Sequence, residues 1–319
     1  MIHRTPALTI AAALLTAVLC TASTASAATE LTGTVTLPCA ATTLEQDANW
    51  YVPEGDPIAL VWIQHGFARN NTHVAALATA FAEAGYLVFT PSLPFLNLSG
   101  CTLQNLGDNT AFLRGVAAMF STASDTTGPL ATSLANAARL AHKPIPRIPH
   151  DQVFIGHSAG AEAALYVAEQ IRTLHPDAWP TLDGVILLDP VRSFLGDNMD
   201  RALSGLGPTP LPVLTVSSPA SMCNSFGLGT LTVRTRLHRT FVGVELPSGA
   251  HTDAEGASSD TLGELLCGVP TQPNSTTLTT LALAWTHDFT TNAITPDDYP
   301  NASNGTLAAA PAARVLTGS

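Results

Sequence analysis

The chain has 319 residues, of which 46% are hydrophobic and 12% are charged. This composition is typical of a protein with a well-filled core and argues against a disordered chain. Thirteen basic residues against twenty-four acidic ones give a formal net charge of −11, which argues against nucleic acids and anionic membranes as partners.

The first 27 residues have the three parts of a secretory signal. Arg4 stands near the start with no acidic residue beside it, an apolar run covers residues 7–19, and Ala25, Ser26 and Ala27 supply a small-residue cleavage site. The apolar run is too short for a stable membrane anchor, and no later run reaches about twenty apolar residues. We therefore expect signal-peptide removal and a soluble, secreted bacterial protein without a stable membrane anchor.

The segments that follow alternate between predicted strands and predicted helices. Apolar runs or alternating patterns predict strands at 31–38, 49–53, 57–66, 86–91, 152–158, 184–189, 211–218 and 240–246. Helical periodicity predicts helices at 72–85, 109–140 with an interruption near 126–129, 159–174 and 276–290. This alternation predicts an α/β fold, a mostly parallel central sheet covered by helices on both faces. We expect one catalytic domain over 28–294 and a loosely ordered tail over 295–319.

A serine between two glycines marks the junction of a predicted strand and a predicted helix. The pentapeptide "GHSAG" places Ser158 directly after the buried run, with Gly156 and Gly160 on either side. A Gly-x-Ser-x-Gly sequence forms a sharp strand-to-helix turn that exposes the serine hydroxyl at the carboxyl end of a sheet. The alternative is a glycine-rich turn in which the serine only caps the helix. The position between strand and helix favours Ser158 as a nucleophile.

A nucleophilic serine needs a histidine base, which in this type of fold follows it in the chain. Four histidines come after Ser158: His175 ends a predicted helix, His287 lies in the final helix, and His238 stands among three arginines in an expected exposed strand or hairpin. His251 lies in the loop "SGAHTDAEG", just beyond the last predicted strand. We therefore expect His251 to be the base, although a loop histidine without a role is the alternative.

The base needs a carboxylate to orient it. The usual position for this acid, after the strand at 211–218, has no carboxylate, whereas the preceding strand ends in Asp189 followed by Pro190. A lone carboxylate at the end of a buried strand requires a partner, and His251 would be that partner. Two alternatives stay open: Asp189 could cap the next turn, or Asp253 could be the acid, although it lies only two residues from His251.

The heptapeptide "QHGFARN" (64–70) ends the strand expected to neighbour the nucleophile strand. Gly66 permits a tight turn there, so the backbone N–H groups of Phe67 and Ala159 would form an oxyanion hole. The Phe67 ring could also line an acyl pocket or be a core aromatic residue. His65 and His157 are expected to have structural roles.

Four cysteines remain after the leader, and an even number in an exported protein indicates two disulfides. Sequence permits three pairings. We expect the pairs Cys39–Cys101 and Cys223–Cys267, so that one disulfide lies within the N-terminal half of the chain and the other within the C-terminal half. Their spacing does not suit a metal site.

In this order, the segments "QHGFARN", "GHSAG", "LLDPV" and "GAHTDAEG" resemble the α/β-hydrolase superfamily over essentially the whole mature chain. Within it the pattern is most similar to chlorophyllase-type and bacterial lipase- and cutinase-like serine esterases. The resemblance implies Ser158 as nucleophile, Asp189 as acid, His251 as base, and Phe67 and Ala159 as oxyanion donors. The position of the acid differs from that in typical cutinases.

These observations predict a carboxylic ester hydrolase that acts through an acyl-enzyme intermediate. It would need no metal or organic cofactor, and we expect a monomer acting on a small-molecule, lipid or polyester ester, with no nucleic-acid partner. Two alternatives stay open: an acyltransferase that uses the same triad, and a catalytically silent binding protein on a hydrolase scaffold.

Overall fold

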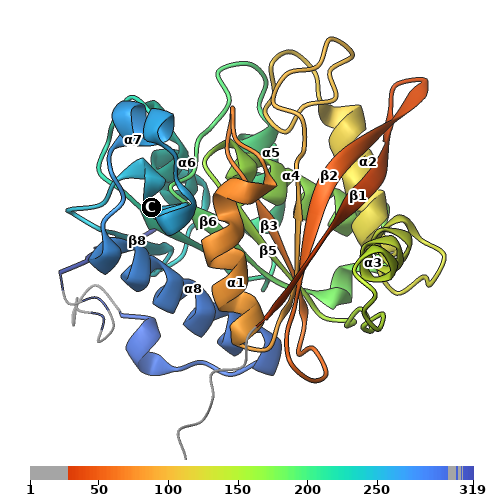
Figure 1. Ribbon diagram of the computed structural model, residues 1–319. Helices are drawn as coiled ribbons and strands as arrows, with labels where there is room; N and C mark the ends of the chain where they lie inside the picture. The colour runs from red at the N-terminus through yellow and green to blue at the C-terminus, as the bar shows by residue number, and fades with distance from the viewer. Residues whose placement is uncertain (1–27, 301–306, 308–309, 311) are drawn as a thin grey trace, which may run out of the picture.

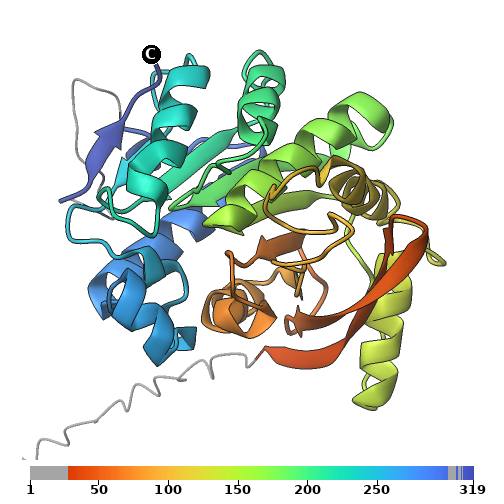
Figure 2. The ribbon, with the colours of Figure 1, turned by 90° about the horizontal axis from the view of Figure 1, so that it is seen from above.

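The computed structural model describes residues 28–300, 307, 310 and 312–319. The predicted signal peptide therefore lies outside the described residues, and so does part of the predicted tail. The described chain folds around one central sheet, with helices on both of its faces (Figures 1 and 2).

The sheet has nine strands in the spatial order β1-β2-β4-β3-β5-β6-β7-β8-β9. The strands from β4 to β8 in this order run parallel, whereas β1, β2 and β9 pair antiparallel with their neighbours. In chain order they are β1 (Thr29–Cys39), β2 (Thr42–Val52), β3 (Leu60–Gln64), β4 (Leu87–Pro91), β5 (Gln152–His157), β6 (Leu182–Leu188), β7 (Val213–Ser217), β8 (Gly243–Glu245) and β9 (Arg314–Leu316). Every residue of β3 and β5 is buried, as central strands covered on both faces require.

Two separate apolar cores hold the helices to the sheet. One lies under α2 (Thr110–Ser121), α3 (Pro129–Leu140), α4 (Ala159–Leu174), α5 (Asn198–Leu206) and α6 (Leu228–Arg236). The other lies under α1 (Ala75–Glu83) and α8 (Gln272–Thr291). The remaining short helix, α7 (Thr261–Cys267), lies near the end of the sheet at which the parallel strands finish (Figure 1). The predicted fold class, an α/β-hydrolase fold, is confirmed by this strand order and by the helical cover of both faces.

Two local predictions are wrong. The segment 234–240, expected as an exposed strand or hairpin, begins within α6, because Val233 and Leu237 are buried in the core and tertiary packing overrides the local preference. The tail is not loosely ordered throughout, because Arg314–Leu316 pairs with Gly243–Glu245 as the edge strand β9. The exposed edge of β8 provides the partner for this strand.

Both predicted disulfides are present. Cys39–Cys101 joins the end of β1 to the loop after β4, and Cys223–Cys267 joins the loop after β7 to the end of α7. Their Cα–Cα distances of 5.7 and 5.4 Å are normal for the bond. The second disulfide therefore connects two segments at the end of the sheet where the candidate site lies.

Candidate active site

Ser158 lies in a strained turn between β5 and α4. Its backbone adopts φ 57° and ψ −124°, a conformation that a residue with a side chain adopts rarely. A Cβ at Gly156 would lie 2.5 Å from the Cα of Ala161, and one at Gly160 would lie 2.5 Å from the carbonyl oxygen of Gln64. Close backbone approach therefore requires both glycines in the predicted strand-to-helix turn.

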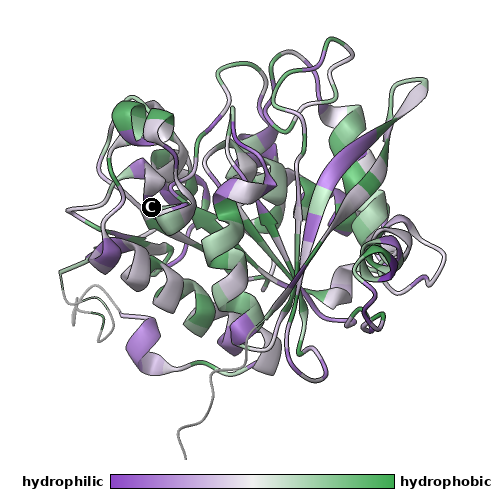
Figure 3. Cartoon of the chain, in the orientation of Figure 1, coloured by the Kyte–Doolittle hydropathy of each residue, from purple (hydrophilic) through white to green (hydrophobic). Residues whose placement is uncertain are grey.

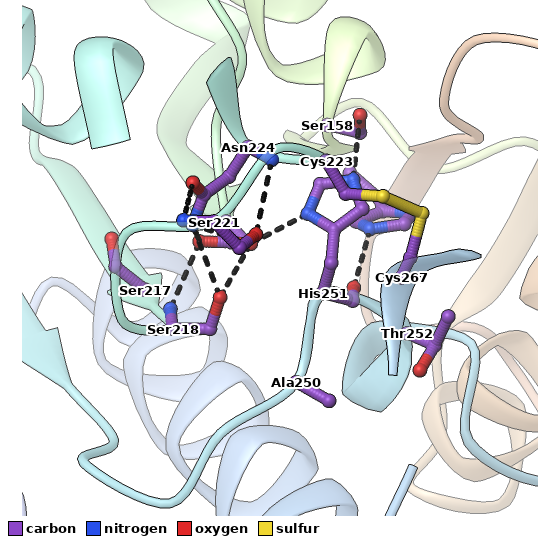
Figure 4. A network of polar contacts seen from close by, with 12 residues as sticks. Ser158, Ser217, Ser218, Ser221, Cys223, Asn224, Ala250, His251, Thr252 and Cys267 are labelled. Atoms are coloured by element: carbon purple, nitrogen blue, oxygen red, sulfur yellow. Dashed lines mark hydrogen bonds and ion pairs between the residues drawn. A yellow bond between two sulfur atoms is a disulfide. The ribbon is translucent and has the colours of Figure 1, made fainter. Parts of the chain in front are cut away.

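Three predicted site residues meet at the carboxyl end of the sheet. His251 Nε2 lies 2.9 Å from Ser158 Oγ, and His251 Nδ1 lies 2.5 Å from Asp189 Oδ2. Figure 4 shows the His251 ring between the serine and the network around the acid. The exposed fractions of Ser158, Asp189 and His251 are 6%, 3% and 7%. These two contacts connect the serine hydroxyl, the imidazole and the carboxylate in one hydrogen-bonded series, with the imidazole in the middle.

Asp189 is held by a network of hydrogen-bond donors that the sequence pattern does not predict. Its carboxylate accepts hydrogen bonds from the backbone N–H and the hydroxyl of Ser218, at 2.9 and 2.7 Å. The amide of Asn224 donates to both carboxylate oxygens at 3.2 and 3.3 Å (Figure 4). Asn224 is itself oriented, because its Oδ1 accepts from the backbone of Ser221 and Gly227. These hydrogen bonds replace the water that the buried carboxyl group has lost and fix its orientation toward His251. The polar run "SSPASMCNS" (217–225) was its only sequence signal.

The alternative acid, Asp253, bonds backbone N–H groups and not the imidazole. Its carboxylate accepts hydrogen bonds from the backbone N–H of Ala250 at 2.6 Å and of Thr271 at 2.9 Å. These bonds stabilise the turn that begins at His251 and tie it to the start of α8. Burial raises the pKa of the Asp253 carboxyl. Asp253 therefore shapes the histidine loop, whereas Asp189 contacts the His251 ring.

The two histidines expected to have structural roles support the same loops. His157 Nε2 lies 2.9 Å from the carbonyl oxygen of His251 and donates to it. Burial lowers the pKa of His157 well below its usual value, so its ring is neutral. His65 donates from Nδ1 to the carbonyl oxygen of Gly66 at 2.8 Å, and burial lowers its pKa to about 4. Both rings thus act as hydrogen-bond donors to backbone.

The predicted oxyanion donors lie in two segments that approach the serine. Ala159 is the first residue of α4, and Phe67 follows Gly66, at which a Cβ would lie 3.2 Å from Ser158 Oγ. Neither the Phe67 nor the Ala159 backbone N–H donates a hydrogen bond to any residue in the described part of the chain. Both amides are thus available near the serine hydroxyl, one of them at a helix N-terminus.

Exposed apolar side chains surround this end of the sheet. They are the side chain of Phe67 and side chains of the loops after β4, β6 and β7 and of α7. Figure 3 colours α7 as hydrophobic over much of its length. We call this set the apolar rim: Phe67, Phe95, Leu96, Leu98, Phe194, Leu195, Met222, Phe226, Leu262, Leu265 and Leu266. The cavity lined by Asp189 and His251 measures about 10 Å³, too small for a ligand.

A buried glutamate joins two rim loops. Glu162, one turn after Ser158 in α4, is 1% exposed and accepts hydrogen bonds from the backbone N–H and the hydroxyl of Ser193. The same hydroxyl accepts from the backbone N–H of Asn105 at 3.0 Å. Burial raises the pKa of the Glu162 carboxyl. These contacts fix the loops after β4 and β6 relative to the serine.

Among the described residues, no group of three or more histidine, cysteine, aspartate or glutamate side chains is arranged to hold a metal ion. None of the described helices is long and apolar enough to cross a membrane.

No protein-family model matches the chain, and no curated protein matches it. Among solved structures, it is similar to a dienelactone hydrolase from Anabaena variabilis. The two chains are 15% identical with a TM-score of 0.48, and the match covers 84% of this chain and 99% of the other.

Proposed function

We propose that the protein is a serine hydrolase that cleaves carboxylic esters, with Ser158 as nucleophile, His251 as general base and Asp189 as the acid that orients the base. The observation that carries this proposal is the continuous contact from Ser158 Oγ through the His251 ring to the Asp189 carboxylate. The Ser–His–Asp series is an arrangement that activates a serine hydroxyl.

In the proposed reaction, Ser158 Oγ attacks the ester carbonyl carbon while His251 Nε2 takes the hydroxyl proton. The carbonyl oxygen becomes negatively charged and accepts hydrogen bonds from the N–H groups of Phe67 and Ala159. His251 then returns the proton to the leaving alkoxide, which departs as the alcohol. Water, deprotonated by His251, attacks the acyl-serine, the carboxylic acid leaves, and the serine hydroxyl is restored.

The rim supports an apolar, uncharged ester as substrate. The loop at 92–107 contains no charged residue, and neither does the segment 218–230. Removal of an acyl chain from water onto such a surface is favourable by about 25 cal/mol per Å² of apolar area, whereas a charged acyl chain would lose hydration there. We infer that neutral acyl chains are preferred over succinyl-type chains that carry a carboxylate.

Two disulfides support an exported protein, because such bonds persist in oxidising compartments. We infer that the leader at 1–27 is removed during export and that the mature enzyme acts outside the cell, as a monomer without a cofactor.

The proposed hydrolysis is tested directly by substitution of the nucleophile, Ser158. Ser158→Ala is expected to lower kcat for p-nitrophenyl butyrate by about 10⁴-fold or more, because the residual rate then depends on binding and the oxyanion donors alone. A fluorophosphonate probe should label the wild-type chain at Ser158 and leave the variant unlabelled. Hydrolysis by Ser158→Ala at the wild-type rate would refute the proposal.

A further inference from the structure

Arg69 joins the loop of the oxyanion donor to the loop of the base. It follows Phe67 by two residues, and its side chain is only 11% exposed. Arg69 Nε lies 2.9 Å from Glu255 Oε1, and Arg69 Nη1 lies 2.9 Å from Asp260 Oδ1. Glu255 closes the turn that begins at His251, and Asp260 caps the start of α7. One guanidinium therefore connects three segments at the site.

The buried carboxylate of Glu255 has Arg69 as its positively charged partner. Its side chain is 2% exposed, and an unpaired carboxylate at such a position is strongly unfavourable. Two histidines also interact with Glu255: His157, whose neutral ring places Nδ1 3.9 Å from Glu255 Oε1, and His73, which together with Arg69 opposes the rise that burial causes in the pKa of the Glu255 carboxyl. Because His157 directly precedes Ser158 and donates to the carbonyl oxygen of His251, the ion pair lies where the nucleophile, base and oxyanion segments meet.

Gly263 provides the space for the guanidinium. A Cβ at Gly263 would overlap Nη2 of Arg69, so the arginine lies directly against the first turn of α7. The same helix ends at Cys267, whose disulfide partner Cys223 precedes Asn224, the donor to Asp189. The contacts of Arg69 thus continue through α7 to the network that holds the acid.

The backbone beside Arg69 needs such support. Ala68, between Phe67 and Arg69, adopts φ 56°, a left-handed conformation that is unfavourable for alanine. A strained residue of this kind persists when the surrounding contacts determine its conformation. The two ion pairs of Arg69, the residue after Ala68, help to hold this backbone conformation.

We propose that Arg69 is a positioning residue, which holds the Phe67 amide in place as an oxyanion donor and aligns it with the His251 loop through Glu255. This inference rests on the proposed ester hydrolysis. Transition-state stabilisation depends on donor position to within fractions of an ångström. Loss of the Arg69 contacts therefore lowers the rate of the chemical step more than it weakens ground-state substrate binding.

Two variants remove the contacts by different routes. Arg69→Met deletes the charge and keeps an unbranched apolar chain, whereas Gly263→Ala leaves Arg69 in the chain and displaces its flexible end. For each, kcat and KM for p-nitrophenyl butyrate and the inhibition constant of butylboronic acid are measured, with rates expressed per site titrated by a fluorophosphonate. We expect kcat to fall and the boronic acid constant to rise by about 10- to 100-fold in both variants, with KM nearly unchanged.

Two controls separate positioning from general stability. Arg172→Met removes a different ion pair, Arg172 with Glu169 at 2.8 Å on α4, and should leave all three constants unchanged. Arg69→Lys keeps the charge but cannot make both contacts in the guanidinium geometry, so its kcat should lie between those of wild type and Arg69→Met.

The outcomes also separate this inference from the proposed function. If Ser158→Ala is inactive but Arg69→Met and Gly263→Ala keep the wild-type kcat per titrated site and the wild-type affinity for butylboronic acid, the positioning role is wrong and the esterase proposal stands. A rise in KM at unchanged kcat would equally overturn the positioning role. Wild-type activity in Ser158→Ala would instead remove the basis of both.

Discussion

The serine half and the histidine–aspartate half of the site are constructed in different ways. Ser158 is positioned by regular elements, β5 and α4, and by glycines that allow backbones to touch. Asp189 and His251 lie in loops whose shape depends on a disulfide and on side-chain hydrogen bonds, which Ser218 and Asn224 donate and the Asp253 carboxylate accepts. The first half is thus determined by backbone packing and the second by polar side chains.

The difference predicts different consequences of mutation. A change on the serine side should first affect folding, because the close contacts involve backbone atoms that cannot move aside. A change on the histidine–aspartate side should first affect activity, because a loop can lose one hydrogen bond and still fold.

Asp189→Asn should lower kcat by about 10⁴-fold while the protein remains folded, because an amide cannot fix the imidazole tautomer or stabilise the imidazolium. The measurement is kcat for p-nitrophenyl butyrate together with thermal unfolding. Asp253→Asn serves as the matched control, since it changes a carboxylate in the turn that begins at His251, and this carboxylate bonds backbone N–H groups and not the imidazole ring. An equal loss of kcat in both variants would contradict the assignment of Asp189 as the acid.

Gly156→Ala should reduce the free energy of unfolding by about 3 kcal/mol, the upper part of the range for overpacking. The added methyl group would overlap the backbone of α4 at Gly160 and Ala161. The measurement is urea unfolding of the purified variant. Gly107→Ala is the control, because a Cβ there meets nothing within 4 Å. A Gly156→Ala protein with wild-type stability would show that the serine side is not determined by backbone packing.

At the opposite end of the sheet, one buried carboxyl group makes the stability of the protein depend on pH. Asp183, near the start of β6, has its pKa raised from 3.8 to about 7, first by burial and then by Asp151, whereas His150 lowers it. Its Oδ2 is buried without a hydrogen-bond partner in the described chain. Between pH 4 and 7 the unfolded chain releases this proton before the folded chain does, so the wild type loses stability as the pH rises through this range.

Asp183→Asn cannot ionise and avoids this loss. Its Tm should match that of the wild type at pH 4 and exceed it at pH 8, by about 2–4 °C for each kcal/mol gained. The kcat should not change, because the residue lies at the amino end of its strand, away from the triad. A Tm difference that is the same at pH 4 and pH 8 would contradict the raised pKa.

The sequence allowed the regular half of the site to be predicted almost completely. Strand, glycine pattern and helix identify Ser158 within eighteen consecutive residues, 151–168. Asp189 and His251 could be predicted because each follows the end of a strand. The disulfide pairing was predicted from the division of the chain into two halves.

The supporting contacts could not be predicted, because they join positions that are far apart in the chain. Asn224 and Asp189 are 35 residues apart, and Arg69 and Glu255 are 186 residues apart. No local pattern identifies such partners. The helix at Leu228–Arg236 was missed for a related reason: its core contacts, at Val233 above all, outweigh a local pattern that resembles a strand.

The short strand β9 also covers the outer edge of β8. Arg314–Leu316 occupies the free edge of β8, so the N–H and C=O groups of Gly243–Glu245 are paired within the chain. A chain truncated before Arg314 would expose them, and unpaired strand edges are sites at which separate molecules aggregate. We therefore expect removal of Arg314–Leu316 to increase association between molecules, measurable as the apparent mass on size-exclusion chromatography.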